Sequence, residues 1–153
     1  MKKSLILFIA FSLISFTYLS NTSAQGGPNW RGSGGWGPGN PYSRMFNPST
    51  VETVKGEVVS VDMMTPAKGM SNGIHLTLKT DKETISVHLG PAWYIEGQDV
   101  QIQPKDKIEV KGSRITFNGQ PAIIAMEVKK GDSTLILRDA NGFPAWRGWR
   151  RGM

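Results

Sequence analysis

The sequence predicts an all-β domain, a small antiparallel barrel of five or six strands with one short helical turn. Apolar and polar residues alternate in short segments between residues 51 and 137, which is the pattern of half-buried strands. Turn-forming pairs such as Asn118-Gly119 and Gly131-Asp132 separate these segments. Helical periodicity is nearly absent, and no unit of about 20–50 residues repeats.

Six segments carry the strand pattern. The first is a β-branched run in which Gly56 suggests a bulge or a sharp bend. Residues 62–73, which are rich in turn formers, are expected to form the loop that follows. The second and third segments alternate strictly and are expected to pair across a turn at residues 80–83. In chain order, the expected strands are 54–61, 74–78, 85–89, 108–110 extended by 114–117, 122–128 and 134–137.

Residues 90–105 interrupt the alternation, and residues 91–96 within them suit one helical turn. An irregular crossing segment at this point of a small ring of strands favours an OB-like barrel, a fold that often carries a helix there. A small open β-sandwich is the alternative architecture.

The first 24 residues predict an exported protein. Two lysines follow Met1, residues 5–19 are mostly apolar, and the small residue Ala24 suits a cleavage site before Gln25. This is the organisation of a secretory signal peptide. An uncleaved membrane anchor is the alternative, but the apolar run is shorter than the ~20 residues that a bilayer span needs. We therefore expect a periplasmic or secreted chain with no transmembrane span after cleavage.

The mature chain is long enough for one domain. Residues 25–50 are rich in Gly and Pro and predict a flexible linker. Three apolar side chains near its end can fold back onto the domain: Tyr42, Met45 and Phe46. The barrel domain is expected over residues 51–145, and residues 146–153 form a tail rich in Trp and Arg. The chain has no cysteine, which excludes disulfides, thiolate metal sites and haem attachment through Cys.

The net charge of +6 is concentrated near the ends of the chain. Lys2 and Lys3 leave with the leader, which lowers the net charge to +4. Five arginines lie between residue 25 and residue 50 or after residue 145, so residues 51–145 carry a net charge of −1. A groove that follows phosphates needs concentrated Lys and Arg. We therefore do not expect nucleic acid as a partner of this domain.

Two histidines form the sharpest candidate site. A two- or four-residue turn at residues 80–83 places His75 directly opposite His88. Directly opposed side chains have Cβ atoms about 4.5–5.5 Å apart, and both histidines are expected on the outward face. Two imidazoles at this spacing can share a copper, zinc or haem iron. The preceding loop supplies soft donors for Cu(I): Met63, Met64 and Met70. The alternative is that the pairing is a coincidence and the methionines pack over the barrel end.

Aromatic residues mark two further candidate sites. The tail interleaves tryptophan and arginine, which can bind an envelope protein or an anionic surface through cation–π and charge contacts: Trp146, Arg147, Trp149, Arg150 and Arg151. Its alternative role is structural, with the tryptophans packed against the barrel and the arginines solvated. In the crossing segment, Trp93 and Tyr94 are expected to close the barrel end, and stacking on a ligand is their alternative role.

No catalytic set is recognisable in the sequence. It lacks a Gly-rich phosphate loop, a Cys nucleophile, a zinc-protease motif and a serine in a nucleophile elbow. The twelve acidic residues are scattered, and their spacing places no pair for acid–base work. We expect no enzymatic activity, and no cofactor unless a transition metal occupies the histidine pair.

Four stretches form a set that is found together in one family: VETVKGEV at residues 51–58, LGPAWY at 89–94, LRD at 137–139 and GWRR at 148–151. They resemble the domain of the magnetosome-associated MamS and MamX proteins. The resemblance covers residues 41–151 and implies an exported, non-catalytic β-domain, which in some relatives is linked to iron or redox chemistry. This chain departs from relatives that carry c-type haem motifs because it has no cysteine. Neither a haem role nor biomineralisation is carried over.

The sequence thus favours an exported, non-catalytic binding and interaction module of the bacterial cell envelope, with the tail as its docking element. One alternative is a periplasmic metal-handling protein that binds copper, zinc or iron through His75 and His88. The other is a nucleic-acid-binding OB domain, which the charge distribution disfavours.

Overall fold

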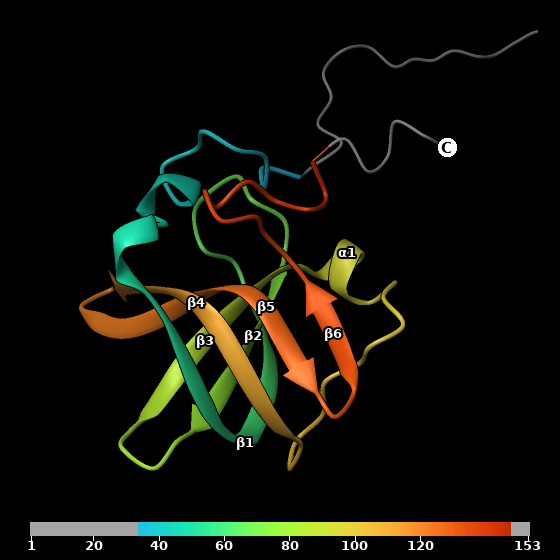
Figure 1. Cartoon of the computed structure of the whole chain (residues 1–153). Coiled ribbons are helices and arrows are strands. Elements are labelled where there is room, and N and C mark those ends of the chain that lie inside the picture. The colour runs from blue at the N-terminus through green and yellow to red at the C-terminus, as the bar shows by residue number, and fades with distance from the viewer. Residues whose placement is uncertain (1–33, 148–153) are drawn as a thin grey trace, which may run out of the picture. The chain divides into compact units, whose positions relative to one another are not determined.

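The computed structural model describes residues 34–147, which form six strands, one short helix and two 3-10 turns (Figure 1). The 3-10 turns span Ser43–Met45 and Pro48–Thr50. Each strand overlaps a segment in which the sequence predicts one, and the helix falls at the expected place. In chain order the elements are β1 (Val51–Met64), β2 (Gly73–Lys79), β3 (Thr84–Pro91), α1 (Ala92–Ile95), β4 (Lys107–Phe117), β5 (Gln120–Lys130) and β6 (Ser133–Ile136).

The strands form one sheet in the order β3-β2-β1-β4-β5-β6, antiparallel at each step. β3 also pairs in parallel with β5, from Ser86 opposite Ala122 to His88 opposite Ile124. This pairing closes five strands into a barrel-like ring, and β6 lies outside the ring against β5 (Figure 1). The predicted all-β, OB-like fold class is confirmed.

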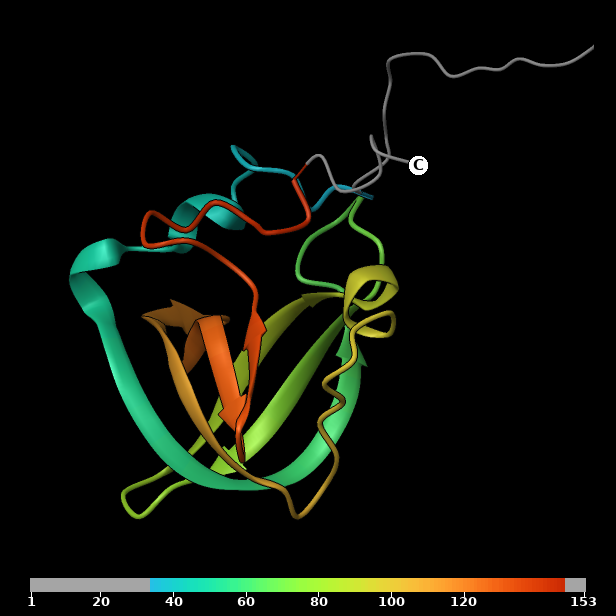
Figure 2. The same ribbon diagram turned by 45° about the vertical axis from the view of Figure 1, so that its right-hand side comes forward.

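The long strand β1 bends, so that its two halves pair with different strands of the ring (Figure 2). Its first half pairs with β4 and its second half with β2. Gly56 lies at the changeover, where a Cβ atom would be 2.4 Å from the carbonyl oxygen of Lys79. The sharp bend predicted at this glycine is therefore explained by a close backbone approach. The bulge itself lies two residues later, between Val58 and Ser60.

The short turns follow the local sequence. Asn118 and Gly119 both have positive φ, 50° and 79°, as a two-residue turn between antiparallel strands requires. In the β2–β3 turn, the Thr80 hydroxyl oxygen accepts hydrogen bonds from the backbone N–H groups of Lys82 and Glu83. This four-residue turn gives the register that the sequence predicts for β2 and β3.

The interior of the ring is filled by aliphatic side chains. Each fully buried side chain of this kind contributes about 1.5–3 kcal/mol through the hydrophobic effect. On β5, residues 122–126 are all buried, although a strand with one solvated face would alternate. Both faces of β5 are therefore covered. The fully buried interior side chains include Leu76, Leu78, Val87, Leu89, Val110 and Val128.

Residues 34–50, which we call the strap, pack on β3 and β4, where Tyr42 contacts His88 and Phe117 and the backbone N–H of Asn47 donates to the Ser113 hydroxyl. Trp36, Tyr42 and Phe46 of the strap are buried against the ring. The prediction of flexibility therefore fails for residues 34–40, whereas the expected folding back of Tyr42 and Phe46 is observed. The Gly- and Pro-rich composition is misleading here because the rest of the domain buries the aromatic rings of Trp36, Tyr42 and Phe46. Residues 25–33, like the predicted leader, lie outside the described part of the chain.

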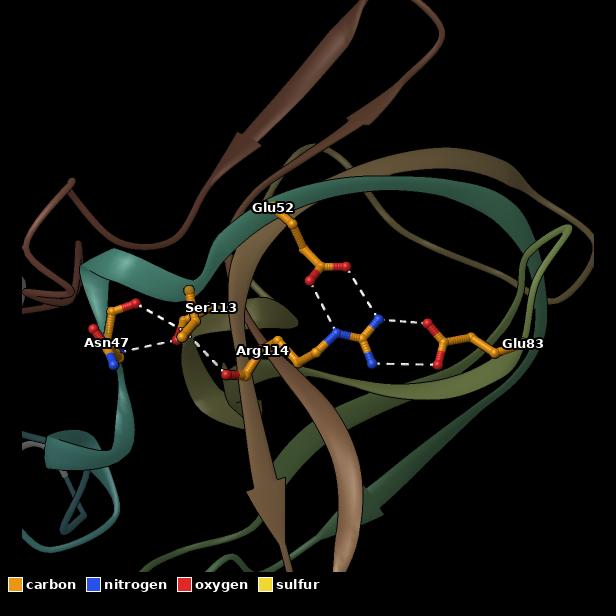
Figure 3. Close-up of polar contacts among 6 residues, drawn as sticks. Asn47, Glu52, Glu83, Ser113 and Arg114 are labelled. Atoms are coloured by element: carbon orange, nitrogen blue, oxygen red, sulfur yellow. Dashed lines mark hydrogen bonds and ion pairs between the residues drawn. The ribbon is translucent and has the colours of Figure 1, made fainter.

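Arg114 holds one end of the ring together (Figure 3). Its Nε donates to Glu52 Oε2 at 2.9 Å, and its Nη1 and Nη2 donate to the Glu83 carboxylate in the β2–β3 turn. Beside it, the Ser113 hydroxyl accepts a hydrogen bond from the backbone N–H of Asn47 at 2.9 Å. These contacts fix both the β2–β3 turn and the end of the strap.

Candidate functional site

The outer face of β2 and β3 is covered at one end and open at the other. A Cβ at Gly73 would lie 2.3 Å from the Trp36 ring, and one at Gly90 would lie 2.7 Å from the Trp146 ring. Only glycine leaves room for the two indoles, whose ring centroids are 6.2 Å apart. The partly or fully exposed residues further along this face are Thr77, Lys79, Thr84 and Ser86.

His75 and His88 lie directly opposite each other, next to the two glycines on which Trp36 and Trp146 pack. Their ring centroids are 6.2 Å apart and the ring planes meet at 68°. Both lie on the outer face of the ring, as expected, but His88 is only 2% exposed whereas His75 is half-buried. His88 is nevertheless shielded from solvent on this outer face, because Tyr42 of the strap packs on it.

His88 is enclosed by aromatic side chains. Its Nδ1 shares a hydrogen bond of 2.9 Å with the hydroxyl of Tyr42, and the Phe117 ring meets it edge-on with centroids 4.9 Å apart. Burial lowers the pKa of His88 to about 4, and the nearby His75 and Arg138 act in the same direction. His88 is therefore a neutral imidazole at neutral pH. Burial also raises the pKa of Tyr42 to about 12, so its phenol keeps its proton.

Arg138 is a buried cation that no carboxylate of residues 34–147 pairs with. Its Nη1 donates to the carbonyl oxygens of Leu89 at 2.9 Å and Ala125 at 2.6 Å. Its guanidinium lies 4.9 Å from the centroid of the Trp146 ring, a cation–π distance. Burial lowers the pKa of Arg138 to about 10, which still leaves it protonated at neutral pH.

The backbone partners of Arg138 explain its place in the fold. The parallel pairing of β3 with β5 ends at His88 and Ile124, so the next residues, Leu89 and Ala125, are where the strands separate. Arg138 bridges their carbonyl oxygens across this separation. The sequence prediction did not single out Arg138 as a site residue. The available signal was its position inside the LRD stretch, and its neighbour Leu137 is fully buried.

His75 carries an unpaired nitrogen. Its Nδ1 is buried and has no hydrogen-bond partner among the described residues. A buried polar atom without a partner is unusual in folded proteins and asks for an explanation such as a bound water or ion.

The three candidate methionines are not brought to one point. Met63 and Met64 belong to the end of β1 rather than to the predicted loop, and only Met70 lies in that loop. Met64 is opposite Gly73, two positions along β2 from His75. Met63 is 56% exposed, and Met70 packs beside Gly35 of the strap. Within the described residues, no three His, Cys, Asp or Glu side chains gather as ligands for an ion.

The tail residues divide into an anchor and an exposed cation. Trp146 is 2% exposed, and its Nε1 donates to the carbonyl oxygen of Trp36 at 2.9 Å. It therefore packs as part of the core, which is the structural alternative for this tryptophan. Arg147 is exposed, and its guanidinium lies 4.8 Å from the centroid of the Phe143 ring. Trp149, Arg150 and Arg151 lie outside the described residues.

The crossing-segment aromatics sit on α1 at the end of the ring. Tyr94 is buried, with its ring centroid 5.3 Å from that of Trp146, and Trp93 is half-buried. Both pack against the hydrophobic core. The structure therefore puts them where a barrel-end plug was expected.

A separate open groove of about 590 Å³ lies over β1 and β4 and reaches the turn after β5. Positively and negatively charged side chains are interspersed along its lining. Lys55 and Glu109 form an ion pair of 3.6 Å across the groove. Such a mixture of charges does not select an anionic ligand. The charged lining residues are Lys55, Glu57, Lys107, Glu109 and Lys129.

Across residues 34–147, no helix has the length and apolar character needed to cross a membrane.

Comparison with known proteins supports the resemblance drawn from the sequence. No curated protein matches the chain. The family model described as the MamS/MamX magnetosome protein family matches residues 50–135, more than half of the sequence and all of the ring. The chain belongs to the MamS/MamX magnetosome protein family.

Proposed function

We propose that this chain is an exported, non-catalytic binding module of the bacterial cell envelope that docks onto an anionic partner through its basic tail. The observation that carries the proposal is the contrast between Trp146 and Arg147. Trp146 is fixed in the core, whereas Arg147, the next residue, is exposed. The first residue of the tail is therefore a buried anchor, and its second residue is an exposed cation.

The surface at this point suits an anionic partner. Phe143 is 42% exposed and lies under the Arg147 guanidinium, so an aromatic face holds the cation where a partner can reach it. Arg150 and Arg151 follow within four residues, and residues 148–153 contain no acidic side chain. Clustered cations of one sign steer and hold an anionic surface.

The distinctive polar groups of the domain support binding rather than catalysis. Tyr42, His88 and Arg138 are buried. The Tyr42–His88 hydrogen bond joins the strap to β3, and the hydrogen bonds of Arg138 join the segment after β6 to β3 and β5. The nitrogen and oxygen atoms that make these hydrogen bonds are occupied within the fold and do not act on a substrate. The strap also covers one end of the outer face on which OB-like rings bind oligonucleotides, so we do not propose nucleic acid as the ligand.

The envelope is proposed as the compartment on the strength of the N-terminal leader. The name of the family refers to magnetosomes. For this chain we propose the envelope in general, because the described residues carry no chemistry that is specific to a mineral.

The proposal is tested by cross-linking in the native envelope. The exported chain is compared with R147Q/R150Q/R151Q, which removes three positive charges from the tail, and with K55Q/K107Q/K129Q, which removes three from the open groove. We expect the same cross-linked partner from the parent chain and the groove variant, and its loss from the tail variant. Recovery of that partner by the tail variant would show that the tail is not the docking element.

A further inference from the structure

The histidine pair has the features of a small metal site that is independent of the tail. His75 and His88 project from opposed positions on neighbouring strands, so the backbone fixes their spacing. The buried Nδ1 of His75 has no partner among the described residues. One lone pair or one N–H at this point is therefore unsatisfied until a ligand or a solvent molecule binds.

His88 is already oriented by its other nitrogen. Tyr42 holds Nδ1 at 2.9 Å, and Phe117 packs edge-on against the same ring. Histidines that bind metals commonly carry a hydrogen bond on the nitrogen that does not bind, and this bond fixes the ring. Tyr42 thus leaves Nε2 as the nitrogen of His88 that is available to an ion.

The spacing of the two rings is compatible with a two-coordinate ion. With metal–nitrogen bonds of about 2.0 Å, two imidazoles in line across one ion have ring centroids about 6.3 Å apart, whereas tetrahedral ligands have centroids about 5 Å apart. The observed distance is 6.2 Å. Rotation about a linear nitrogen–metal–nitrogen axis is free, so the angle of 68° between the ring planes is compatible with a two-coordinate ion.

Charges of both signs lie near the pair. No three His, Cys, Asp or Glu side chains gather as ligands within residues 34–147. The exposed Asp62 is opposite His75 on β1, whereas the buried cation Arg138 lies close enough to act on His88. Repulsion from this cation is twice as large for a divalent ion as for a monovalent one. Met64, two positions along the paired strand from His75, is the methionine nearest to the pair by register, and a thioether is a soft donor.

We propose that His75 and His88 bind one Cu(I) ion, with Tyr42 as the positioning residue of His88 and Met64 as the neighbouring soft donor. This site goes beyond the proposed docking function and does not depend on it, because its residues lie on β1–β3 and the strap. The two proposals can therefore fail separately.

The test is an anaerobic titration of the full mature chain with Cu(I) in competition with a chromogenic Cu(I) chelator. We expect one equivalent to bind, and His75→Ala to weaken binding by about 100-fold or more, because loss of a ligand costs at least as much as loss of its supporting contact. Thr77→Ala, the next residue on the same face, is the matched control and should bind as the parent does. Unchanged affinity in His75→Ala would overturn the site.

Two further measurements keep the test decisive. His75 is half-buried and has an unpaired nitrogen, so His75→Ala should leave the circular dichroism spectrum and the unfolding midpoint unchanged. His88 is buried, and its replacement could unfold the domain, so His75 is the residue that is changed. X-ray absorption of the Cu(I) complex should show two short nitrogen contacts, and any sulfur contact should disappear in Met64→Leu. Tighter binding of Zn(II) than of Cu(I), or four nitrogen or oxygen ligands around the copper, would overturn the assignment of the ion.

Discussion

Tyr42 Oη lies 2.9 Å from Nδ1 of His88, a residue 46 positions further along the chain, and this contact joins the strap to β3. The two rings are nearly parallel, with an angle of 21° between their planes. Both side chains are buried, so the hydrogen bond also satisfies two polar atoms that water does not reach. The contact explains how a Gly- and Pro-rich segment comes to be part of the domain.

Tyr42→Phe should therefore destabilise the fold. It keeps the ring but removes the hydroxyl, which leaves Nδ1 of His88 buried without this partner and costs about 1–3 kcal/mol. Urea unfolding of the mature chain measures the change in the free energy of unfolding. Ser49→Ala, an exposed position on the same strap, is the control and should stay within about 0.5 kcal/mol of the parent. Equal stability of Tyr42→Phe and the parent would show that the strap does not depend on this bond.

Gly90→Ala should disturb the seat of Trp146. The added Cβ would lie 2.7 Å from the indole ring, so the ring or the strand must move, at a cost of about 1–3 kcal/mol. We expect a red-shifted tryptophan emission and a lower unfolding midpoint. Gly97→Ala is the matched control, since a Cβ there meets its nearest atom at an ordinary 3.7 Å. If both variants behave alike, close packing at Gly90 is not what fixes Trp146.

Arg138→Met should loosen the contact between β3 and β5. The substitution keeps a long side chain but removes the donors to Leu89 and Ala125, and an unsatisfied buried carbonyl costs about 1–3 kcal/mol. Hydrogen exchange should then rise in residues 86–89 and 122–125 relative to the β1–β4 ladder. Uniform protection across both ladders would argue against a role for Arg138 in closing the ring.

The Arg114 cluster predicts part of the acid sensitivity. Hydrogen bonding to Arg114 lowers the pKa of Glu83 in the folded chain. A lowered folded pKa gives stability that is present above the unfolded glutamate pKa of about 4.3 and is lost as the pH falls through the folded value. Glu83→Gln should therefore reduce stability at neutral pH and flatten its decline in acid. Glu57 is an exposed carboxylate with no ion pair in the described part of the chain, so Glu57→Gln is the control. Its free energy of unfolding should fall with decreasing pH as steeply as that of the parent. If Glu57→Gln flattened this decline as much as Glu83→Gln, the acid sensitivity would not come from the Arg114 cluster.

Local patterns were sufficient to predict the strands and the register of β2 with β3. The length of the turn at residues 80–83 and strict alternation place His75 opposite His88 without any knowledge of the rest of the fold. Asn118-Gly119 likewise specifies its own hairpin. These predictions succeed because the residues that decide them are adjacent in sequence.

The strap and the burial of His88 could not be predicted in the same way. Trp36 lies in a segment whose composition indicates flexibility, and its seat is made by Gly73, which is 37 residues away. The glycines inside the alternating strands were the available signal, because a strand glycine often marks the close approach of another group. Which group approaches depends on long-range packing, and that is not encoded in either segment alone.

Docking through the tail can be measured by the binding of the purified mature chain to isolated envelope membranes as the salt concentration is increased. We predict saturable binding that weakens with salt, survives in K55Q/K107Q/K129Q and is lost in R147Q/R150Q/R151Q. Each variant removes three positive charges, so the comparison distinguishes binding through the tail from attraction by net charge alone. Equal loss of binding in both variants, or full binding by the tail variant, would show that the tail is not the docking element.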